Sequence, residues 1–298
     1  IKEYDGNTTT VQPIFNNKNT HVSYEIIWKT KSEKNGAWSI ADSDLIVDNN
    51  LSVKNVLDSG YYAFTLKVFA RVNYLDNLGQ QQTAEITYLE HNVISPYQQF
   101  KIDISKKTLN LQQEINKIYD GTNSLEYIIV KDDIALTQLC GKDQLDGKTI
   151  TITYSSSKFD SVITNIEVSE SSKQDKVIHN YNFDWKSESK ILKRNLTLNI
   201  GENHVVYSGG YPLIQVKTLT DYNNNVYIPI YNGEASVTLT NNKVLTGLDF
   251  VFSNLYVTTN NVNVGKYNSD NLNANDLIVM YKNIEVTENF NINLDIDS

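Results

Sequence analysis

The chain has 298 residues, of which 40% are hydrophobic and 20% charged, with 35 Asp and Glu against 26 Lys and Arg. This composition is outside the range of disordered chains, and a net charge of −9 argues against nucleic acid and anionic membranes as partners. A single cysteine, Cys140, excludes an intrachain disulfide, and we expect it to be a small buried hydrophobe.

No apolar run is long enough to span a membrane, so we expect no membrane insertion in this segment. The chain starts at Ile1 without a signal-like region. We therefore expect the export signal and any anchor to lie outside this sequence.

Apolar and polar residues alternate with the two-residue period of β-strands along the whole chain. The clearest segments are residues 22–28, 64–70, 150–154, 236–239 and 290–296. Turn-forming Asn, Asp and Gly separate such segments, and no window of ten or more residues has convincing helical periodicity. The sequence predicts an all-β protein.

One short motif repeats. Tyr4-Asp5-Gly6 recurs as Tyr119-Asp120-Gly121 and, more loosely, as Tyr207-Ser208-Gly209. Residues 106–111 and 193–198, which precede the second and third copies, both have the order basic, basic, polar, Leu, polar, Leu. The repeats predict three modules, 1–104, 105–190 and 191–298, each the size of a small β-sandwich. The short links favour an extended arrangement.

The motif has a structural interpretation. The glycine permits a left-handed turn, the aspartate closes the turn through its side chain, and the tyrosine covers the end of the sandwich. We favour this interpretation over a direct contact with a ligand.

Residues 115–122, with the sequence INKIYDGT, resemble the signature of the bacterial YDG and MBG repeat modules. Residues 130–134 and 179–183 also match pieces of that family, and residues 205–212 extend the likeness to the third module, where Ser208 replaces the aspartate. The resemblance implies tandem immunoglobulin-like β-sandwich modules of large bacterial surface and adhesin-type proteins. It carries no catalytic residues over to this chain.

The first module is similar to immunoglobulin-like domains in general, through residues 23–29, 51–53 and 58–61. In that fold a tryptophan packs in the core, and a corner tyrosine forms a hydrogen bond back to the main chain. The resemblance implies these roles for Trp28 and Tyr61.

No catalytic or metal-binding motif is present. The four histidines are far apart in the sequence, and Asp42, Asp44 and the pair 132–133 lack the ligand spacing of a calcium loop. We therefore expect no catalytic residue, no metal and no cofactor, and hence no enzyme.

Tyr222, Tyr227 and Tyr231 crowd one stretch beside the asparagines 223–225, which suits a sugar-binding surface. Tyr227 and Tyr231 share strand parity, so core packing is the alternative. The sequence favours a monomeric, non-catalytic stalk segment at the cell surface or outside the cell. The second hypothesis is an adhesin module that binds a host or environmental glycan or protein.

Overall fold

Strands dominate the structure. The computed structural model describes residues 1–13, 22–91, 94, 99–201, 209–211, 213–221, 223–224, 226–231, 237–240, 250–253, 256–259, 272–274 and 277–296. In these ranges the only helical elements are short 3₁₀ turns, so the all-β prediction is confirmed. They are η1 (Ser43–Leu45), η2 (Val56–Asp58), η4 (Lys131–Asp133), η5 (Leu136–Gln138), η6 (Glu170–Ser172), η7 (Ile178–Asn180) and η9 (Thr287–Asn289).

The chain divides into two compact units. Unit 1 holds Ile1–Gln112, Ile128–Ile150 and Glu167–Asp184, and unit 2 holds Gln113–Tyr127, Thr151–Ile166 and Trp185–Ser298. The predicted modules 1–104, 105–190 and 191–298 stay a prediction. The predicted joints near residues 104 and 190 each lie inside one unit.

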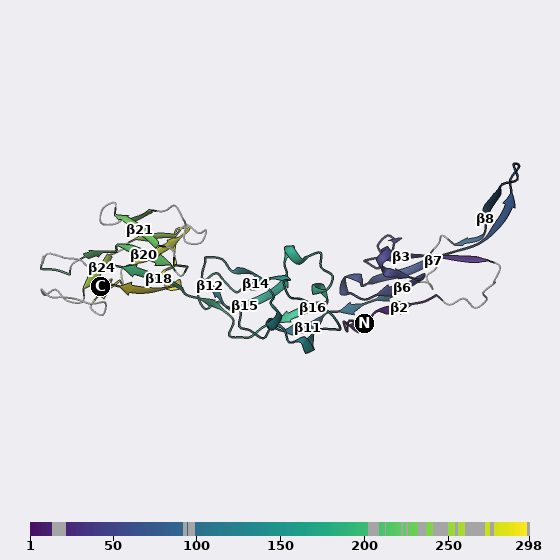
Figure 1. Ribbon diagram of the computed structural model, residues 1–298. Coiled ribbons are helices and arrows are strands. Elements are labelled where there is room, and N and C mark those ends of the chain that lie inside the picture. The colour runs from purple at the N-terminus through teal and green to yellow at the C-terminus, as the bar shows by residue number, and fades with distance from the viewer. Residues whose placement is uncertain are drawn as a thin grey trace. The chain divides into compact units, whose positions relative to one another are not determined.

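The strands of unit 1 come mainly from the first third of the chain (Figure 1). They are β1 (Lys2–Glu3), β2 (Thr9–Val11), β3 (Ser23–Lys31), β4 (Ser39–Ile40), β5 (Ile46–Val47), β6 (Asn50–Val53), β7 (Gly60–Leu75), β8 (Gln81–His91), β9 (Phe100–Ile102), β10 (Ile104–Ser105), β11 (Lys107–Asn110) and β16 (Tyr181–Asp184). One sheet has the order β4-β3-β7-β8, and a second has the order β2-β6-β5.

The strands of unit 2 lie mostly in the last third. They are β12 (Lys117–Ile118), β17 (Ile191–Leu192), β18 (Arg194–Asn199), β19 (Leu213–Gln215), β20 (Thr218–Asp221), β21 (Val226–Tyr231), β22 (Val237–Thr240), β23 (Phe250–Ser253), β24 (Tyr256–Thr259), β25 (Leu272–Asn273), β26 (Ile278–Tyr281), β27 (Ile284–Glu285) and β28 (Phe290–Asp295). The largest sheet has the order β22-β21-β20-β18-β28. Three more strands, β13 (Ser124–Ile128), β14 (Thr149–Tyr154) and β15 (Ile163–Val168), have residues in both units.

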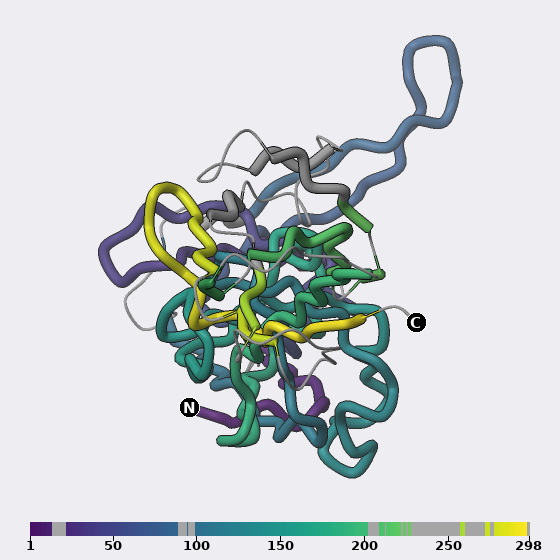
Figure 2. Tube along the Cα trace, turned by 90° about the vertical axis from the view of Figure 1, so that its left-hand side faces the viewer, coloured from purple at the N-terminus to yellow at the C-terminus, as the bar shows by residue number. Residues whose placement is uncertain are grey.

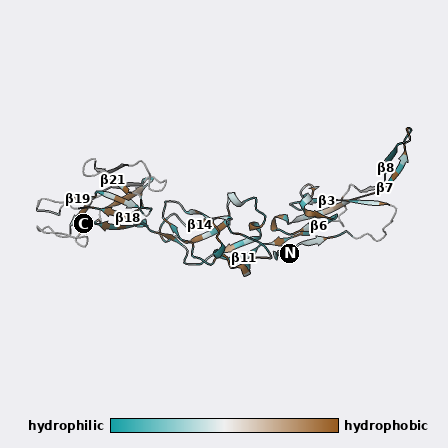
Figure 3. Cartoon of the chain, viewed as in Figure 1, coloured by the Kyte–Doolittle hydropathy of each residue, from teal (hydrophilic) through white to brown (hydrophobic). Residues whose placement is uncertain are grey.

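Period-two alternation places apolar side chains in the interior of both units, and hydrophobic and hydrophilic residues alternate along the strands in Figure 3. In unit 1, Leu51 and Val53 of β6 are fully buried, and in unit 2 the same is true of Leu198 on β18 and Leu219 on β20. Each fully buried side chain of this kind stabilises the fold by about 2 kcal/mol.

Each unit pairs two strands in parallel that lie far apart in the sequence. In unit 1, β11 pairs with β16, so that Lys107 lies opposite Tyr181. In unit 2, β18 pairs with β28, so that Arg194 lies opposite Phe290. In both pairs the strand nearer the C-terminus begins with an aromatic residue.

Strand β7 is longer than its partner β3. The β3 pairing covers only Tyr61 to Phe69 of β7. Beyond Phe69, β7 continues with β8 as a two-stranded ribbon that projects from the rest of unit 1 in both views (Figures 1 and 2).

The core of the first sheet is aromatic. The indole of Trp28 is buried, donates from Nε1 to the carbonyl of Asn49 at 3.0 Å, and packs edge-on against Phe64 and Phe100. The hydroxyl of Tyr62 is buried and donates to the carbonyl oxygen of Asp58.

The bond back to the main chain is therefore made by Tyr62, which corrects the prediction of Tyr61 by one residue. Neighbouring side chains of a strand point to opposite faces. Tyr62 points inward with the core, whereas the ring of Tyr61 lies near the ammonium groups of Lys31 and Lys101, at 5.8 and 6.0 Å from its centroid.

The bond of Tyr62 predicts an alkaline sensitivity. Burial, followed by the charge of Asp58, raises the pKa of Tyr62 to about 12. The neutral phenol is favoured in the folded state, so its stabilisation is complete below pH 10 and is lost as the pH rises towards 12. Tyr62→Phe should lower the free energy of unfolding by about 1 kcal/mol at neutral pH. It should also reduce the loss of stability between pH 9 and 11, measured by urea unfolding.

Tyr61→Phe is the matched control, because it removes the hydroxyl of the adjacent tyrosine and leaves the ring in place. An equal effect of the two substitutions would contradict the assignment of the buried bond to Tyr62.

Candidate functional site

The first copy of the motif forms a short parallel strand pair in unit 1. Strand β1 pairs with β10, which leaves the predicted first module, and the amide of Tyr4 donates to the carbonyl of Ser105 at 2.9 Å. Gly6 has a φ of +77°, and the carboxylate of Asp5 accepts from the amide of Asn7 at 2.9 Å. That bond and the ammonium of Lys2 lower the pKa of Asp5 to about 2. This geometry supports the structural interpretation of the motif.

Tyr4 contacts a strand from the predicted second module. Its ring is buried and lies edge-on to that of Tyr181, with 5.5 Å between centroids. Both hydroxyls donate to the same carboxylate oxygen of Asp143, at 2.7 and 2.8 Å. Burial, reinforced by these bonds to Asp143, raises the pKa of Tyr4 and of Tyr181 well above the ordinary tyrosine value, so both phenols stay protonated at neutral pH. We call this arrangement of β1, β10, Tyr4, Asp143 and Tyr181 the first seam.

Cys140 lies under the turn of the first seam. It is buried, its amide donates to the hydroxyl of Tyr181 at 2.9 Å, and its Sγ is 3.6 Å from both the carbonyl of Tyr4 and the Nζ of Lys107. A Cβ on Gly6 would come within 2.9 Å of the Cβ of Cys140. Gly6 is therefore required both for the left-handed turn and for this close approach.

The second copy repeats the arrangement in unit 2. Strand β12 pairs in parallel with β17, and the amide of Tyr119 donates to the carbonyl of Leu192 at 2.9 Å. Gly121 has a φ of +83°, and Asp120 accepts from the amide of Thr122 at 2.9 Å and pairs with the buried ammonium of Lys117.

Tyr119 meets an aromatic residue in the same way as Tyr4. Its buried ring lies edge-on to that of Phe290, with 5.6 Å between centroids. Phe290 begins β28 as Tyr181 begins β16. Burial is the main cause that raises the pKa of Tyr119 to about 12. We call β12, β17, Tyr119 and Phe290 the second seam.

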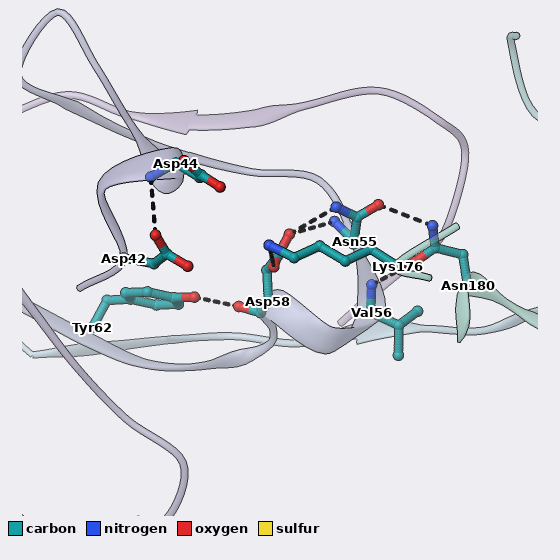
Figure 4. Close-up of polar contacts among 8 residues, drawn as sticks. All are labelled: Asp42, Asp44, Asn55, Val56, Asp58, Tyr62, Lys176 and Asn180. Atoms are coloured by element: carbon teal, nitrogen blue, oxygen red, sulfur yellow. Dashed lines mark hydrogen bonds and ion pairs between the residues drawn. The ribbon is translucent and has the colours of Figure 1, made fainter. Parts of the chain in front are cut away.

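In each seam, the residue directly before the aromatic residue of the closing strand is an asparagine, and its side chain forms hydrogen bonds to another segment. In unit 1, Asn180 Oδ1 accepts from the amide of Val56 at 2.7 Å, and its Nδ2 donates to Asn55 Oδ1 at 3.0 Å (Figure 4). In unit 2, Asn289 Oδ1 accepts from the amide of Phe159 at 2.6 Å, and its Nδ2 donates to the carbonyl of Val286 at 3.0 Å. Both asparagines are buried and end a 3₁₀ turn.

Figure 4 shows that further polar contacts connect Asn55 to the first sheet of unit 1. Asp58 Oδ2 accepts from the amide and from Nδ2 of Asn55, both at 3.0 Å. The ammonium of Lys176 lies 3.6 Å from Asp58 Oδ1, and Asp58 also supplies the carbonyl that binds Tyr62. A chain of polar contacts therefore runs from Asn180 through Asn55 to the buried tyrosine of the first sheet.

Sequence reasoning missed Asn180, Asn289 and Asp143. The two asparagines had a readable signal, because each directly precedes the aromatic residue that opens a closing strand. Asp143 had none, since nothing in its neighbourhood marks it as the acceptor for two distant tyrosines.

The structure describes only one of the three tyrosine side chains that we considered as ligand contacts. Tyr227 is buried, and its hydroxyl lies 3.3 Å from the carboxylate of Asp221, which supports the alternative of a core side chain. Tyr222 and the side chain of Tyr231 lie outside the described residues, as do Tyr207 and Ser208 of the third motif copy. Gly209 of that copy is described and has a φ of +81°.

Tyr227 belongs to a buried polar cluster of unit 2. Arg194 Nη2 lies 3.5 Å from Asp221 Oδ2, and both side chains are almost wholly buried. Asp221 Oδ1 also accepts from the amide of Asn223 at 2.9 Å. Burial, then the charge of Asp221, raises the pKa of Tyr227. This cluster links β18, β20 and β21.

The acidic pairs considered for calcium are used in local turns. Asp42 Oδ1 accepts from the amide of Asp44 at 3.1 Å, and Asp133 Oδ2 accepts from the amide of Val130 at 2.8 Å. Within the described ranges, no group of three or more His, Cys, Asp and Glu side chains is placed to hold a metal ion. The same ranges contain no helix long and apolar enough to cross a membrane.

No protein-family model matches the chain, and no curated protein or solved structure matches it either. The likeness to YDG and MBG modules therefore depends on the sequence motifs alone, chiefly on residues 115–122.

The aromatic contact of the second seam can be measured by a double-mutant cycle. Tyr119→Leu and Phe290→Leu each remove one ring, and edge-to-face pairs contribute about 1 kcal/mol beyond the area they bury. We expect a coupling energy of that size in urea unfolding. Tyr119→Leu combined with Val226→Ala, which changes an exposed side chain of β21, is the control. Additivity in the Tyr119–Phe290 cycle would contradict the contact.

The buried ion pair of unit 2 gives a second prediction. Asp221→Asn leaves the Arg194 guanidinium buried beside a neutral group, which typically costs about 3–5 kcal/mol. Glu285→Gln removes an exposed carboxylate from the same unit and should change stability little. Thermal and urea unfolding of both variants test this, and an equal effect would argue against a paired interior charge.

Proposed function

We propose that the chain is a non-catalytic structural segment, a stalk, of a bacterial protein at the cell surface or outside the cell. In this proposal it consists of tandem immunoglobulin-like β-sandwich modules of the YDG and MBG type. The observation that carries the proposal is the repetition of one joint. Two seams with different residues use the same parallel strand pair, the same left-handed turn and the same edge-on aromatic contact.

A repeated joint is expected in a segment whose function is to hold successive modules in a fixed arrangement. Each seam has backbone hydrogen bonds, a buried ring pair and an asparagine whose side chain accepts a hydrogen bond from a backbone amide of another segment. Such a joint resists local opening, because opening it would expose buried amides and rings to water together.

The chemistry at the first seam favours a structural role over an enzymatic one. Asp143 accepts from two tyrosine hydroxyls whose pKa values are raised, so these phenols are poor bases or nucleophiles at neutral pH. Cys140 is buried beneath the same turn, which limits the access of a substrate to its thiol.

The adhesin hypothesis has less support at the tyrosine cluster on which it was based. The burial of Tyr227 removes the central ring from the proposed sugar-binding surface. The alternative then rests on Tyr222 and Tyr231.

The asparagine caps test the structural proposal. Asn180→Ala combined with Asn289→Ala leaves the amides of Val56 and Phe159 without their acceptors and should cost about 1–3 kcal/mol at each site. We expect faster cleavage by trypsin near both seams. The control, Asn110→Ala combined with Asn291→Ala, changes exposed asparagines on β11 and β28. Equal cleavage of the two double variants would contradict a fastening role for the seams.

The setting needs a separate test. Antibodies against the chain should label intact, unpermeabilised cells of the source bacterium, or the protein should be recovered from its medium. Detection only after lysis would contradict the proposed location.

A further inference from the structure

Strand β9 of unit 1 is paired along one edge. It runs antiparallel to the start of β7, with Phe100 opposite Tyr62 and Ile102 opposite Gly60. Within the described ranges, no strand pairs with its other edge. Such an edge presents backbone N–H and C=O groups to a further strand and is therefore a template for strand addition.

The bonds directly after β9 show which backbone groups point to this edge. The carbonyl of Asp103 accepts from the amide of Lys2 in β1 at 2.9 Å. Ile104 points the other way, because its amide donates to Oγ of Ser59, the residue before β7. Since these directions alternate along an extended strand, the N–H and C=O of Lys101 lie on the same edge as the pairing with β1.

The corresponding edge is covered on the two other closing strands that begin with an aromatic residue, β16 and β28. Strand β11 runs parallel to β16, and the amide of Leu111 donates to the carbonyl of Asp184 at 2.9 Å. Strand β18 runs parallel to β28, and the amide of Ile200 donates to the carbonyl of Asp295 at 2.9 Å. Asp103 accepts the same kind of bond at the end of β9. The strand that should precede this bond has no counterpart among the described residues.

The covered edges also bring a leucine into the interior. Leu109 of β11 lies opposite Phe183 and is fully buried, and Leu196 of β18 lies opposite Ile292 and is 1% exposed. The same position beside β9 is opposite Ile102, which is only half-buried. The ring that opens β9 is half-buried too, whereas the rings that open β16 and β28 are 1% and 4% exposed.

We propose that this edge of β9 is the docking site of one further β-strand, supplied by the same polypeptide as it leads into β1 from a preceding module of the same type. The strand runs parallel to β9 and places a leucine opposite Ile102. The inference rests on the proposed stalk function, since it adds a module to the array. The chain already contains such connections, because β10 is followed directly by β11, and β17 by β18.

The register favours this source over a separate molecule. Lys2 lies opposite Ile104, which places Ile1 opposite Asp103 and leaves the three positions opposite residues 100–102 for the added strand. Three paired residues would hold a separate peptide only weakly. A strand that is continuous with β1 is already aligned by the β1–β10 pair, so it gains the same bonds without the loss of translational and rotational freedom that association brings.

Adding the strand to the full chain tests the proposal. The sequence Lys-Thr-Leu, which is that of residues 107–109 in β11, is joined directly to Ile1, so that its leucine falls opposite Ile102. We expect hydrogen exchange at the amides of Lys101 and Asp103 to slow by at least about tenfold, because both point to the added strand. The amide of Ile102 faces β7 and is the internal control.

The extension Lys-Thr-Ser is the matched control, because it has the same length and charge but lacks the leucine. It should leave exchange at Lys101 and Asp103 within about twofold of the unextended chain, since a strand without a buried side chain is held weakly. No slowing by Lys-Thr-Leu, or equal slowing by the two extensions, would overturn the proposal.

A free peptide distinguishes the source of the strand. The peptide Lys-Lys-Thr-Leu-Asn-Leu, with the sequence of residues 106–111, is added to the unextended chain and should not slow exchange at Lys101. Slowing equal to that by the joined strand would overturn the proposed source and assign the edge to a separate molecule. Exchange at these amides does not depend on where the protein is found, so this test can fail while antibody labelling of intact cells still supports the stalk.

Discussion

The parallel pairing of two very short strands determines how the interior of each unit is packed. Strands β1 and β12 each carry two paired residues, and each lies beside a strand that comes much later in the chain. This pairing fixes the direction in which the chain enters the Tyr-Asp-Gly turn. The left-handed glycine then sets the turn. In both seams the tyrosine side chain points into the interior and packs against an aromatic ring.

Polar groups make these interiors specific. A buried amide or hydroxyl costs free energy unless it is paired, so an arrangement that pairs all of them excludes neighbouring registers. In the first seam, one carboxylate accepts from two tyrosines that are far apart in the sequence, Tyr4 and Tyr181. In unit 2, Arg194 and Asp221 join β18 to β20 in a similar way.

Sequence reasoning predicted the general features and missed those that depend on partners far along the chain. Alternation identified the strands, and the repeated motif indicated where the seams lie. The corner tyrosine was misplaced by one residue because Tyr61 and Tyr62 are adjacent, and only the phase of β7 against β3 distinguishes them. The projecting β7–β8 ribbon could not be predicted, since alternation in residues 70–75 and 81–86 has the same pattern as a strand that covers a core. A strand extends beyond its neighbour because of the register in which the two pair, and this register cannot be predicted from composition.

The parallel strand pairs also determine how each unit responds to tension along the chain. In β11 with β16, and in β18 with β28, the two strands run in the same direction. A pull on the start of the first strand and the end of the last moves them past each other, so every hydrogen bond of the pair is loaded in shear together. An antiparallel pair pulled from adjacent ends would open one bond at a time. The β18–β28 pair has six registered positions against four in β11–β16, so the unit 2 pair is the stronger mechanical clamp.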